Sequence, residues 1–262
     1  MLFEDHIVYQ IVLNIKKDHP RMGTRKIYHL IKPELQRSNI KIGRDALFDL
    51  MAANNLKVTK RKRRYITTNS NHAYRKYPNL IRDMEPDGPN QIWVSDITYI
   101  RSGNEFIYLF LITDAYSKKI IGCKLANTLD SMHAVNSLQD ALKNNRQPIT
   151  GLIHHSDRGI QYCSKEYIRV LQENKIKISM TEKGDPLENA IAERVNGILK
   201  DEYRNLYQNL TTLQLEKSIE KYNRKRPHLS CDMLTPELAH QASGKLKKRW
   251  KNYYKKTVTL NQ

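Results

Sequence analysis

QIWVSDITYI, residues 91–100, is a run of β-branched and aromatic residues that carries one carboxylate, Asp96, near its centre. Residues of these types favour a β-strand. Aspartate is disfavoured in strands, and a buried carboxylate is costly unless it has a partner. Taken alone, Asp96 could be a structural aspartate or could face water at a strand edge. The other interpretation is that the position keeps its carboxylate for chemistry.

Strands and helices alternate after this first strand. The pattern predicts strands over 106–113, 119–125, 149–155 and 176–180, and helices over 131–143, over 164–174 and from Asp185 onward. Ser164 is suited to cap the second of these helices. Three strands followed by helix–strand alternation predict an α/β fold, with a mixed sheet flanked by helices.

A second carboxylate, Asp157, follows the strand over 149–155 in the run HHSDRGIQY, residues 154–162. Ligands gather at strand ends in open α/β sheets. An aspartate before a glycine turn is also common without any function. His154 and His155 are expected to shape this strand end, and Asp114 is expected to belong to a turn.

A third carboxylate, Glu193, lies on the helix predicted to begin at Asp185. Asp185 suits the N-cap and Glu188 the third helical position, which resembles a capping box. Lys200 is seven positions beyond Glu193, so the two return to within about 20° on one face. A solvated polar face is the simpler explanation. Gly197 within the helix costs about 1 kcal/mol relative to alanine, however, and so predicts close approach of another group.

The charge of the chain points to a polyanion. Lys and Arg number 45 against 27 Asp and Glu, which leaves a net charge of +18 in 262 residues. Basic density peaks over 57–64. The composition divides the chain into a helical unit over 1–56, a basic linker over 57–90 and a larger unit over 91–250. Three widely spaced cysteines without a CxxC motif indicate a reducing compartment.

The unit over 1–56 shows three stretches of apolar residues at helical spacing. Arg44 opens the third stretch, whose helix could enter a major groove. The connection before it exceeds the usual three or four residues of a helix-turn-helix. A plain three-helix bundle and a helix-turn-helix therefore both remain open on periodicity alone.

Several blocks together resemble the DDE transposases of bacterial insertion sequences. The blocks are Trp93–Tyr99, His155–Tyr162 and Glu188–Glu193, with Arg21–Ile27 similar to the helix-turn-helix motif and Tyr222–His228 to the C-terminal block. Sixty residues lie between Asp96 and Asp157, and 35 between Asp157 and Glu193. The second gap, and Lys200 seven residues beyond the glutamate, are typical of the family. The chain resembles the second-frame product of the group whose transposase is split over two overlapping frames.

The resemblance implies a ribonuclease-H-like core of the retroviral integrase type, preceded by a helix-turn-helix domain. Asp96, Asp157 and Glu193 would be catalytic and would bind two Mg²⁺ or Mn²⁺ ions, since hard cations prefer oxygen ligands. The implied activity is metal-dependent cleavage and strand transfer at insertion-sequence ends. A hydrolytic nuclease with the same ligands and a sequence-specific repressor are the alternatives; the repressor leaves the three acids unexplained.

The resemblance also implies partners. These are transposon-end and target DNA, further copies of the chain on DNA, and a first-frame transposase product; no membrane is expected among them. The expected location is the bacterial cytoplasm at the nucleoid. The DNA contacts are expected to come from Arg44, Lys200 and the linker residues Lys60, Arg61, Lys62, Arg63 and Arg64.

Overall fold

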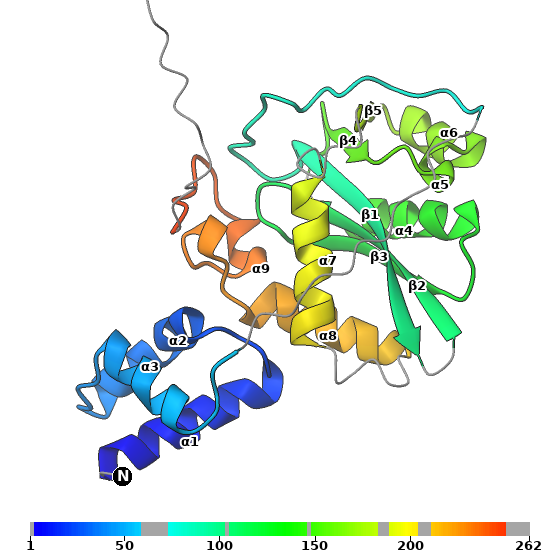
Figure 1. Cartoon of the computed structure of the whole chain (residues 1–262). Helices are drawn as coiled ribbons and strands as arrows, with labels where there is room; N and C mark the ends of the chain where they lie inside the picture. Colours follow the sequence, from blue (N-terminus) through cyan, green and yellow to red (C-terminus); the bar gives the residue numbers. More distant parts are fainter. Residues whose placement is uncertain are drawn as a thin grey trace, which may run out of the picture.

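A computed structural model describes residues 3–58, 73–102, 105–145, 148–182, 189–203 and 211–249. Three helices, α1 (Phe3–Asp18), α2 (Thr24–Arg37) and α3 (Arg44–Ala53), form a small N-terminal unit beside a larger α/β core (Figure 1). In this described part of the chain, no helix is long and apolar enough to cross a membrane.

The N-terminal unit has its own apolar core, as the helical periodicity predicted. Val12, Ile27, Leu47 and Met51 are each completely buried in it. Residues 38–43 connect α2 to α3, and Asn39 within this connection has a φ of 53°. The three-helix arrangement is thus confirmed, whereas DNA binding by these helices as a helix-turn-helix stays a prediction.

The core contains a five-stranded sheet in the order β3-β2-β1-β4-β5. The strands are β1 (Ile92–Ser102), β2 (Glu105–Asp114), β3 (Ile120–Ala126), β4 (Ile153–Ser156) and β5 (Lys177–Met180). The first three pair antiparallel as a meander, while β1–β4 and β4–β5 pair parallel. The mixed sheet predicted from the sequence is therefore confirmed.

Helices cover both faces of this sheet (Figure 1). On one face, α4 (Ser131–Asn144) and α6 (Lys165–Glu173) pack on Trp93 and Phe110. On the other face, α7 (Ala190–Glu202) and α8 (Thr212–Lys225) pack on Leu109 and Leu111. Burial of large apolar side chains on both faces stabilises the layered arrangement. Short helices α5 (Ile160–Cys163) and α9 (Pro236–Ala239) complete the described core.

Three local expectations need correction. The strand expected over 149–155 begins at Ile153, because Gly151 adopts a φ of 79° in a turn just before it. The helix expected from Asp185 begins at Ala190, with Asn189 at its N-cap and no side-chain cap bond. Asp185 and Glu188, on which the expected capping box depends, lie outside the described residues. The short helix α5 was not expected at all.

The second half of the expected linker lies against the core. The Met180 amide donates to the Pro78 carbonyl at 3.2 Å, and the Leu80 amide donates to Ser179 Oγ at 2.9 Å. Residues around 78–80 therefore run beside β5. Residues 59–72 lie outside the described part, so the domain boundaries stay predictions.

Polar contacts, from exposed to buried, join the N-terminal unit to the core. Asp18 at the end of α1 pairs with Lys221 at 2.7 Å and Lys225 at 2.9 Å, both on α8. His19 Nδ1 lies 3.0 Å from the Tyr203 hydroxyl, just after α7. Burial lowers the pKa of His19 to about 4, so the imidazole is neutral at pH 7. The N-terminal helices are thus seated on the C-terminal end of α7.

The contact between α4 and β3 depends on Gly122. An added Cβ there would lie 2.8 Å from Ala141 Cβ and still closer to the Ser137 carbonyl. We expect Gly122→Ala to destabilise the fold by about 1–3 kcal/mol through overpacking. Gly197→Ala is the matched control, because nothing lies within 4 Å of an added Cβ there. That variant should gain up to about 1 kcal/mol. Urea unfolding measures both, and equal effects would contradict the packing argument.

Candidate active site

Asp96 lies in β1 on the sheet face that α7 covers. Its Oδ2 accepts a hydrogen bond of 2.6 Å from Asn196 Nδ2. The neighbouring Ser95 carbonyl accepts a bond of 3.0 Å from Asn189 Nδ2, at the N-cap of α7. Two asparagines two turns apart therefore hold α7 along β1 and fix one oxygen of the Asp96 carboxylate.

Asp157 is partly buried and directly follows β4. Its Oδ1 accepts a hydrogen bond of 3.0 Å from the Gly159 amide, which closes a tight turn. A Cβ at position 159 would lie 2.9 Å from this same oxygen. Glycine at this position therefore lets the backbone approach the carboxylate closely.

The three predicted acids share one electrostatic environment. Burial and the negative charges of Asp157 and Glu193 together raise the pKa of Asp96 to about 7, against hydrogen bonds from Asn196 and the Ile97 backbone that lower it. Like charges in a poorly solvated site oppose ionisation of each other. The charges of Asp157, after β4, and Glu193, on α7, thus act on the Asp96 carboxylate in β1.

The face of α7 that the spacing predicted to be polar is only partly exposed, because Asn189 and Asn196 on it are buried. Glu193 is exposed, whereas Lys200, two turns on, is half-buried. Burial lowers the pKa of Lys200, and the Asp96 carboxylate counteracts that effect. Lys200 thus lies within electrostatic reach of Asp96. The close approach expected at Gly197 does not come from the described residues, since an added Cβ would meet open space.

The chemistry of these residues suits a hard divalent cation, because all three charged donors are carboxylate oxygens. Two further oxygens, Asn189 Oδ1 and Asn196 Oδ1, are buried and have no hydrogen-bond partner in the described part. Among the described residues, no group of three or more His, Cys, Asp or Glu is close enough to hold a metal ion. The donor set therefore fits, although the three acids do not converge on one point.

A buried hydrogen-bonded group supports Asp96 from the opposite sheet face. His154 Nε2 lies 2.7 Å from Ser95 Oγ and 2.8 Å from the Tyr167 hydroxyl. Burial lowers the pKa of His154 to about 3, so its ring is neutral. His155 Nδ1 contacts Ser179 Oγ at 2.8 Å. Both histidines fix strands to their neighbours, as expected, and the sequence did not reveal their partners.

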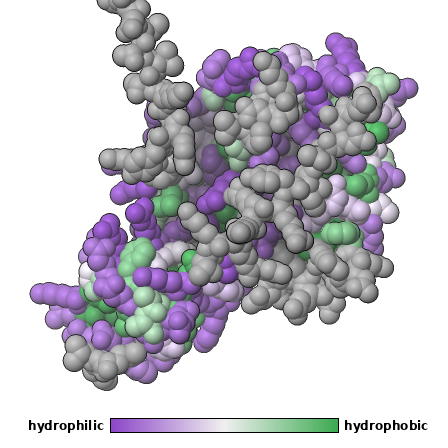
Figure 2. All heavy atoms as spheres, in the orientation of Figure 1, coloured by the Kyte–Doolittle hydropathy of each residue, from purple (hydrophilic) through white to green (hydrophobic). Residues whose placement is uncertain are grey.

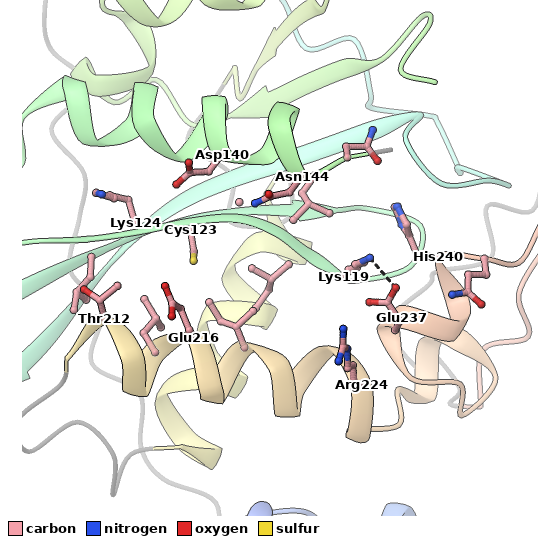
Figure 3. Close-up of a pocket in the computed structure, with 18 residues that line it drawn as sticks. Lys119, Cys123, Lys124, Asp140, Asn144, Thr212, Glu216, Arg224, Glu237 and His240 are labelled. Carbon is pink, nitrogen blue, oxygen red and sulfur yellow. Dashed lines mark hydrogen bonds and ion pairs between the residues drawn. The ribbon is translucent and has the colours of Figure 1, made fainter. Parts of the chain in front are cut away.

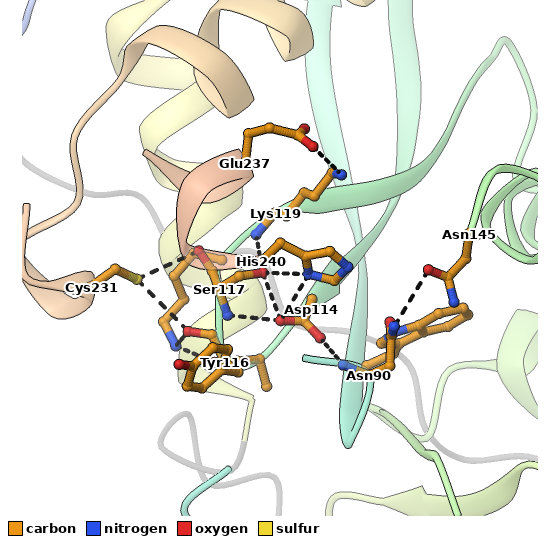
Figure 4. A network of polar contacts seen from close by, with 12 residues as sticks. Asn90, Asp114, Tyr116, Ser117, Lys119, Asn145, Cys231, Glu237 and His240 are labelled. Atoms are coloured by element: carbon orange, nitrogen blue, oxygen red, sulfur yellow. Dashed lines mark hydrogen bonds and ion pairs between the residues drawn. The ribbon is translucent and has the colours of Figure 1, made fainter. Parts of the chain in front are cut away.

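Asp114 is a structural anchor (Figure 4). Its carboxylate accepts bonds from the Asn90 amide at 2.8 Å and from the Ser117 amide and hydroxyl, each at 2.7 Å. Ser117 Oγ also lies 3.0 Å from His240 Nδ1. Asp114, Ser117 and His240 do not form an open nucleophilic site, because all three are buried around the β2–β3 turn. The sequence placed Asp114 in a turn after the strand; the structure makes it the last residue of β2, directly before the turn over 115–117.

A pocket of about 720 Å³ lies elsewhere, between β3, α4, α8 and α9 (Figure 3). Cys123, Asp140 and Glu216 are among the residues that line it, and none of the three predicted acids does. Lys119, also in its wall, is paired with Glu237 at 3.0 Å. The carboxylates of the candidate site therefore do not belong to this pocket.

The expected DNA contacts are only partly described. Lys60, Arg61, Lys62, Arg63 and Arg64 lie outside the described residues. Arg44 is the first residue of α3, and its Nε donates to Asp45 Oδ1 at 2.8 Å. Hydrophilic side chains dominate the coloured surface in the view of Figure 2. The structure places Arg44 in the N-terminal unit and Lys200 beside the acids.

Comparison with known proteins identifies relatives over most of the chain. Two models described as "Integrase core domain" match residues 86–186 and 174–236. The chain is 34% identical over 235 residues to the "Insertion element IS600 uncharacterized 31 kDa protein" of Shigella sonnei, covering 87% of this chain and 85% of the relative. It is 29% identical over 227 residues to the "Transposase for insertion sequence element IS629" of the same organism, covering 85% and 75%.

A solved structure shares the fold. The simian T-cell lymphotropic virus intasome, determined by cryo-electron microscopy in complex with PP2A regulatory subunit B56 gamma, matches with a TM-score of 0.55 and 21% identity. The match covers 80% of this chain and 74% of that chain. Together with the sheet order, it confirms the integrase-type, ribonuclease-H-like core predicted from the sequence.

The raised pKa of Asp96 makes a prediction about stability. The unfolded carboxyl titrates near pH 4 and the folded one near 7, so stability falls as the pH rises between these values. Asp96→Asn removes the charge and should therefore stabilise the metal-free protein at pH 8. The expected gain in the free energy of unfolding is about 1–3 kcal/mol, less than the full pKa shift would give, because Asp96 is partly exposed. At pH 4 the variant should match the parent. Chemical denaturation at both pH values measures this; a difference that does not grow with pH would contradict it.

Proposed function

Because the chain belongs to the integrase-core family of insertion-sequence transposases, we propose that Asp96, Asp157 and Glu193 are the carboxylates at which it cuts and joins DNA. The observation that carries this assignment is the 2.6 Å hydrogen bond from Asn196 of α7 to Asp96 of β1. It holds the helix that carries Glu193 against β1, and Asp157 follows the neighbouring parallel strand β4. The charges of both other acids also raise the pKa of Asp96. Perturbed carboxyl groups cluster at functional sites. We propose metal-dependent cleavage of insertion-sequence ends, followed by transfer of the strand to a target phosphodiester.

Two Mg²⁺ or Mn²⁺ ions are the cofactors of this proposal. Such ions supply activation of the attacking oxygen and stabilisation of the leaving oxygen in phosphoryl transfer. Asp96 would hold both ions, with Asp157 and Glu193 holding one each. Asn196 keeps one Asp96 oxygen, Oδ2, in place. Binding of cations would relieve the like-charge repulsion among the carboxylates.

The remaining charged residues would bind the phosphates of the DNA. Lys200, half-buried beside Asp96, is placed to contact a phosphate near the reacting one. The basic run over 60–64 and Arg44 would contact phosphates further away. The net charge of +18 supports a DNA substrate that covers much of the surface. Its binding would not depend strongly on sequence at these positions.

The proposal extends to assembly. We place the protein in the bacterial cytoplasm at the nucleoid, acting on transposon-end and target DNA as a multimer. The product of a first reading frame would add recognition of the ends, since the chain resembles a second-frame product. A hydrolytic nuclease uses the same carboxylates, so strand joining is the activity that separates the two.

The first test replaces the acids one at a time. Asp96→Asn, Asp157→Asn and Glu193→Gln should each lower joining of pre-cut transposon ends to a plasmid by more than about 100-fold in Mg²⁺, because an amide keeps the shape but loses the anionic ligand. DNA affinity in a gel-shift assay should stay the same or rise. In calorimetry, the heat of Mn²⁺ binding should disappear with each variant.

Glu173→Gln on α6 is the matched control, because this glutamate is 64% exposed and pairs only with Arg169 on the same helix among the described contacts. Its joining activity should equal that of the parent. Glu188→Gln, five residues before Glu193, should stay within a few-fold of the parent. Joining within tenfold of the parent in any acid variant would refute the metal-site assignment, and hydrolysis without joining would favour the nuclease.

The second test concerns the basic run. Neutralising Lys60, Arg61, Lys62, Arg63 and Arg64 together should weaken DNA binding whatever the sequence. The slope of log affinity against log salt should flatten by about 0.9 for each phosphate contact that is lost. Fluorescence anisotropy at several salt concentrations measures the slope. An unchanged slope would show that the run only faces solvent.

A further inference from the structure

Beyond Val94, β1 has no strand partner on the β4 side among the described residues. The register pairs Val94 with His155, and β4 ends at Ser156. On its other side, β1 stays paired with β2 through the whole hairpin. The far half of the β1–β2 hairpin therefore extends past β4, away from β4 and β5 (Figure 1).

Three aromatic rings gather on this extension. Tyr99 and Tyr108 are opposite one another in the register, with ring centroids 5.2 Å apart and planes at 71°. Tyr99 and Phe106 are 6.5 Å apart at 89°. Edge-to-face packing fixes the relative angles of such rings, and each side chain has only two torsions to restrain. We call these three residues the hairpin platform.

The platform is open to solvent, because Phe106 is 52% exposed and both tyrosines are only half-buried. Cross-strand pairing accounts for Tyr99 and Tyr108, since opposed aromatics stabilise hairpins. It does not account for a phenylalanine with half its surface in water. Three rings also offer far less surface than the roughly 800 Å² per partner that a stable protein interface buries. One exposed ring is enough, by contrast, to stack against one nucleobase.

The platform lies close to the candidate site. Tyr99 is three residues beyond Asp96 on β1, or about 10 Å along the strand, and the position paired with Phe106 is five residues beyond, or about 17 Å. These lengths are on the order of three to five base-pair rises of 3.4 Å. Because side chains alternate along a strand, the platform lies on the sheet face opposite to Asp96, and DNA would reach both around the edge of β1 that β4 leaves open. The negative charges of Asp157 and Asp96 also raise the pKa of Tyr99, after the larger effects of burial and Tyr108.

We propose that the hairpin platform binds an unpaired nucleobase of the DNA by stacking, within about five nucleotides of the phosphate that reacts. This inference rests on the proposed function, because DNA reaches the platform only if its phosphate lies at Asp96. Bases stack on exposed aromatic rings with little regard to sequence. The platform would therefore favour DNA ends whose strands separate beside the acids, and Phe106 would be its main contact.

The test measures binding without metal, so that no turnover occurs. Fluorescence anisotropy compares a blunt duplex with the same duplex carrying a short single-stranded tail at one end. The parent should bind the tailed duplex more tightly. Phe106→Ala should reduce this preference about tenfold, in the range expected for loss of one stacked base. Phe106→Leu, which stays apolar, should lose it too, whereas Phe106→Trp should retain it.

Leu213→Ala is the matched control, because Leu213 is a 59% exposed apolar side chain on α8. It should leave the preference unchanged. A 2-aminopurine in the tail should change its fluorescence on binding to the parent and not to Phe106→Ala. Equal weakening of blunt and tailed duplexes by Phe106→Ala would overturn the proposal. So would a change in oligomeric mass without DNA, which would make the platform a protein contact.

The two proposals fail in different ways. The tail preference needs no catalysis, so its absence in a parent that joins DNA in Mg²⁺ counts against the platform alone. A parent that binds tailed DNA through Phe106 but never joins it counts against strand transfer alone. Measuring the preference again in Asp96→Asn, where joining is expected to be lost, separates the two within one protein.

Discussion

Keeping a carboxylate within a central strand is the constraint on which much of this structure depends. A carboxylate removed from water destabilises the fold unless charge or hydrogen bonds compensate it. At Asp96 the compensation comes from hydrogen bonds from the Asn196 side chain and the Ile97 backbone, and two further carboxylates add to the cost. The end of β4 at Ser156 leaves this part of β1 without a parallel neighbour, which gives the carboxylate access to solvent.

The helix α7 connects this constraint to the rest of the molecule. Near its N-terminal end it carries Glu193, and at its C-terminal end Glu202 is bound by Arg226 through two hydrogen bonds of 2.7 and 2.6 Å. Lys26 of the N-terminal unit reaches Glu202 at 3.7 Å. Burial lowers the pKa of Lys26 to about 7, against the attraction of Glu202. The helix α7 therefore carries one of the three acids near one end and contacts the N-terminal unit at the other.

The sequence predicted the features that depend on a regular spacing of residue types along one element. Periodicity identified the three strands of the meander and the face of α7 that carries Glu193 and Lys200, because side-chain direction follows from spacing along one element. It did not predict that Asn196 bonds Asp96 or that His154 bonds Ser95 and Tyr167, since such pairings join residues far apart in the chain. Element ends were missed where a turn such as the one at Gly151 shortened the strand.

Two aspartates on adjacent strands show why the structure was needed to separate a structural from a chemical carboxylate. Asp96 interrupts the apolar residues of one strand and Asp114 follows those of the next, and taken alone each could be a structural aspartate. Burial would raise the pKa of Asp114, but hydrogen bonds from His240 and Ser117 outweigh it and lower the pKa. At Asp96, burial and the negative charges of Asp157 and Glu193 outweigh the hydrogen bonds from Asn196 and Ile97, so its pKa rises. Donors that already saturate a carboxylate leave no oxygen for a ligand, whereas unrelieved repulsion leaves a site that a cation stabilises.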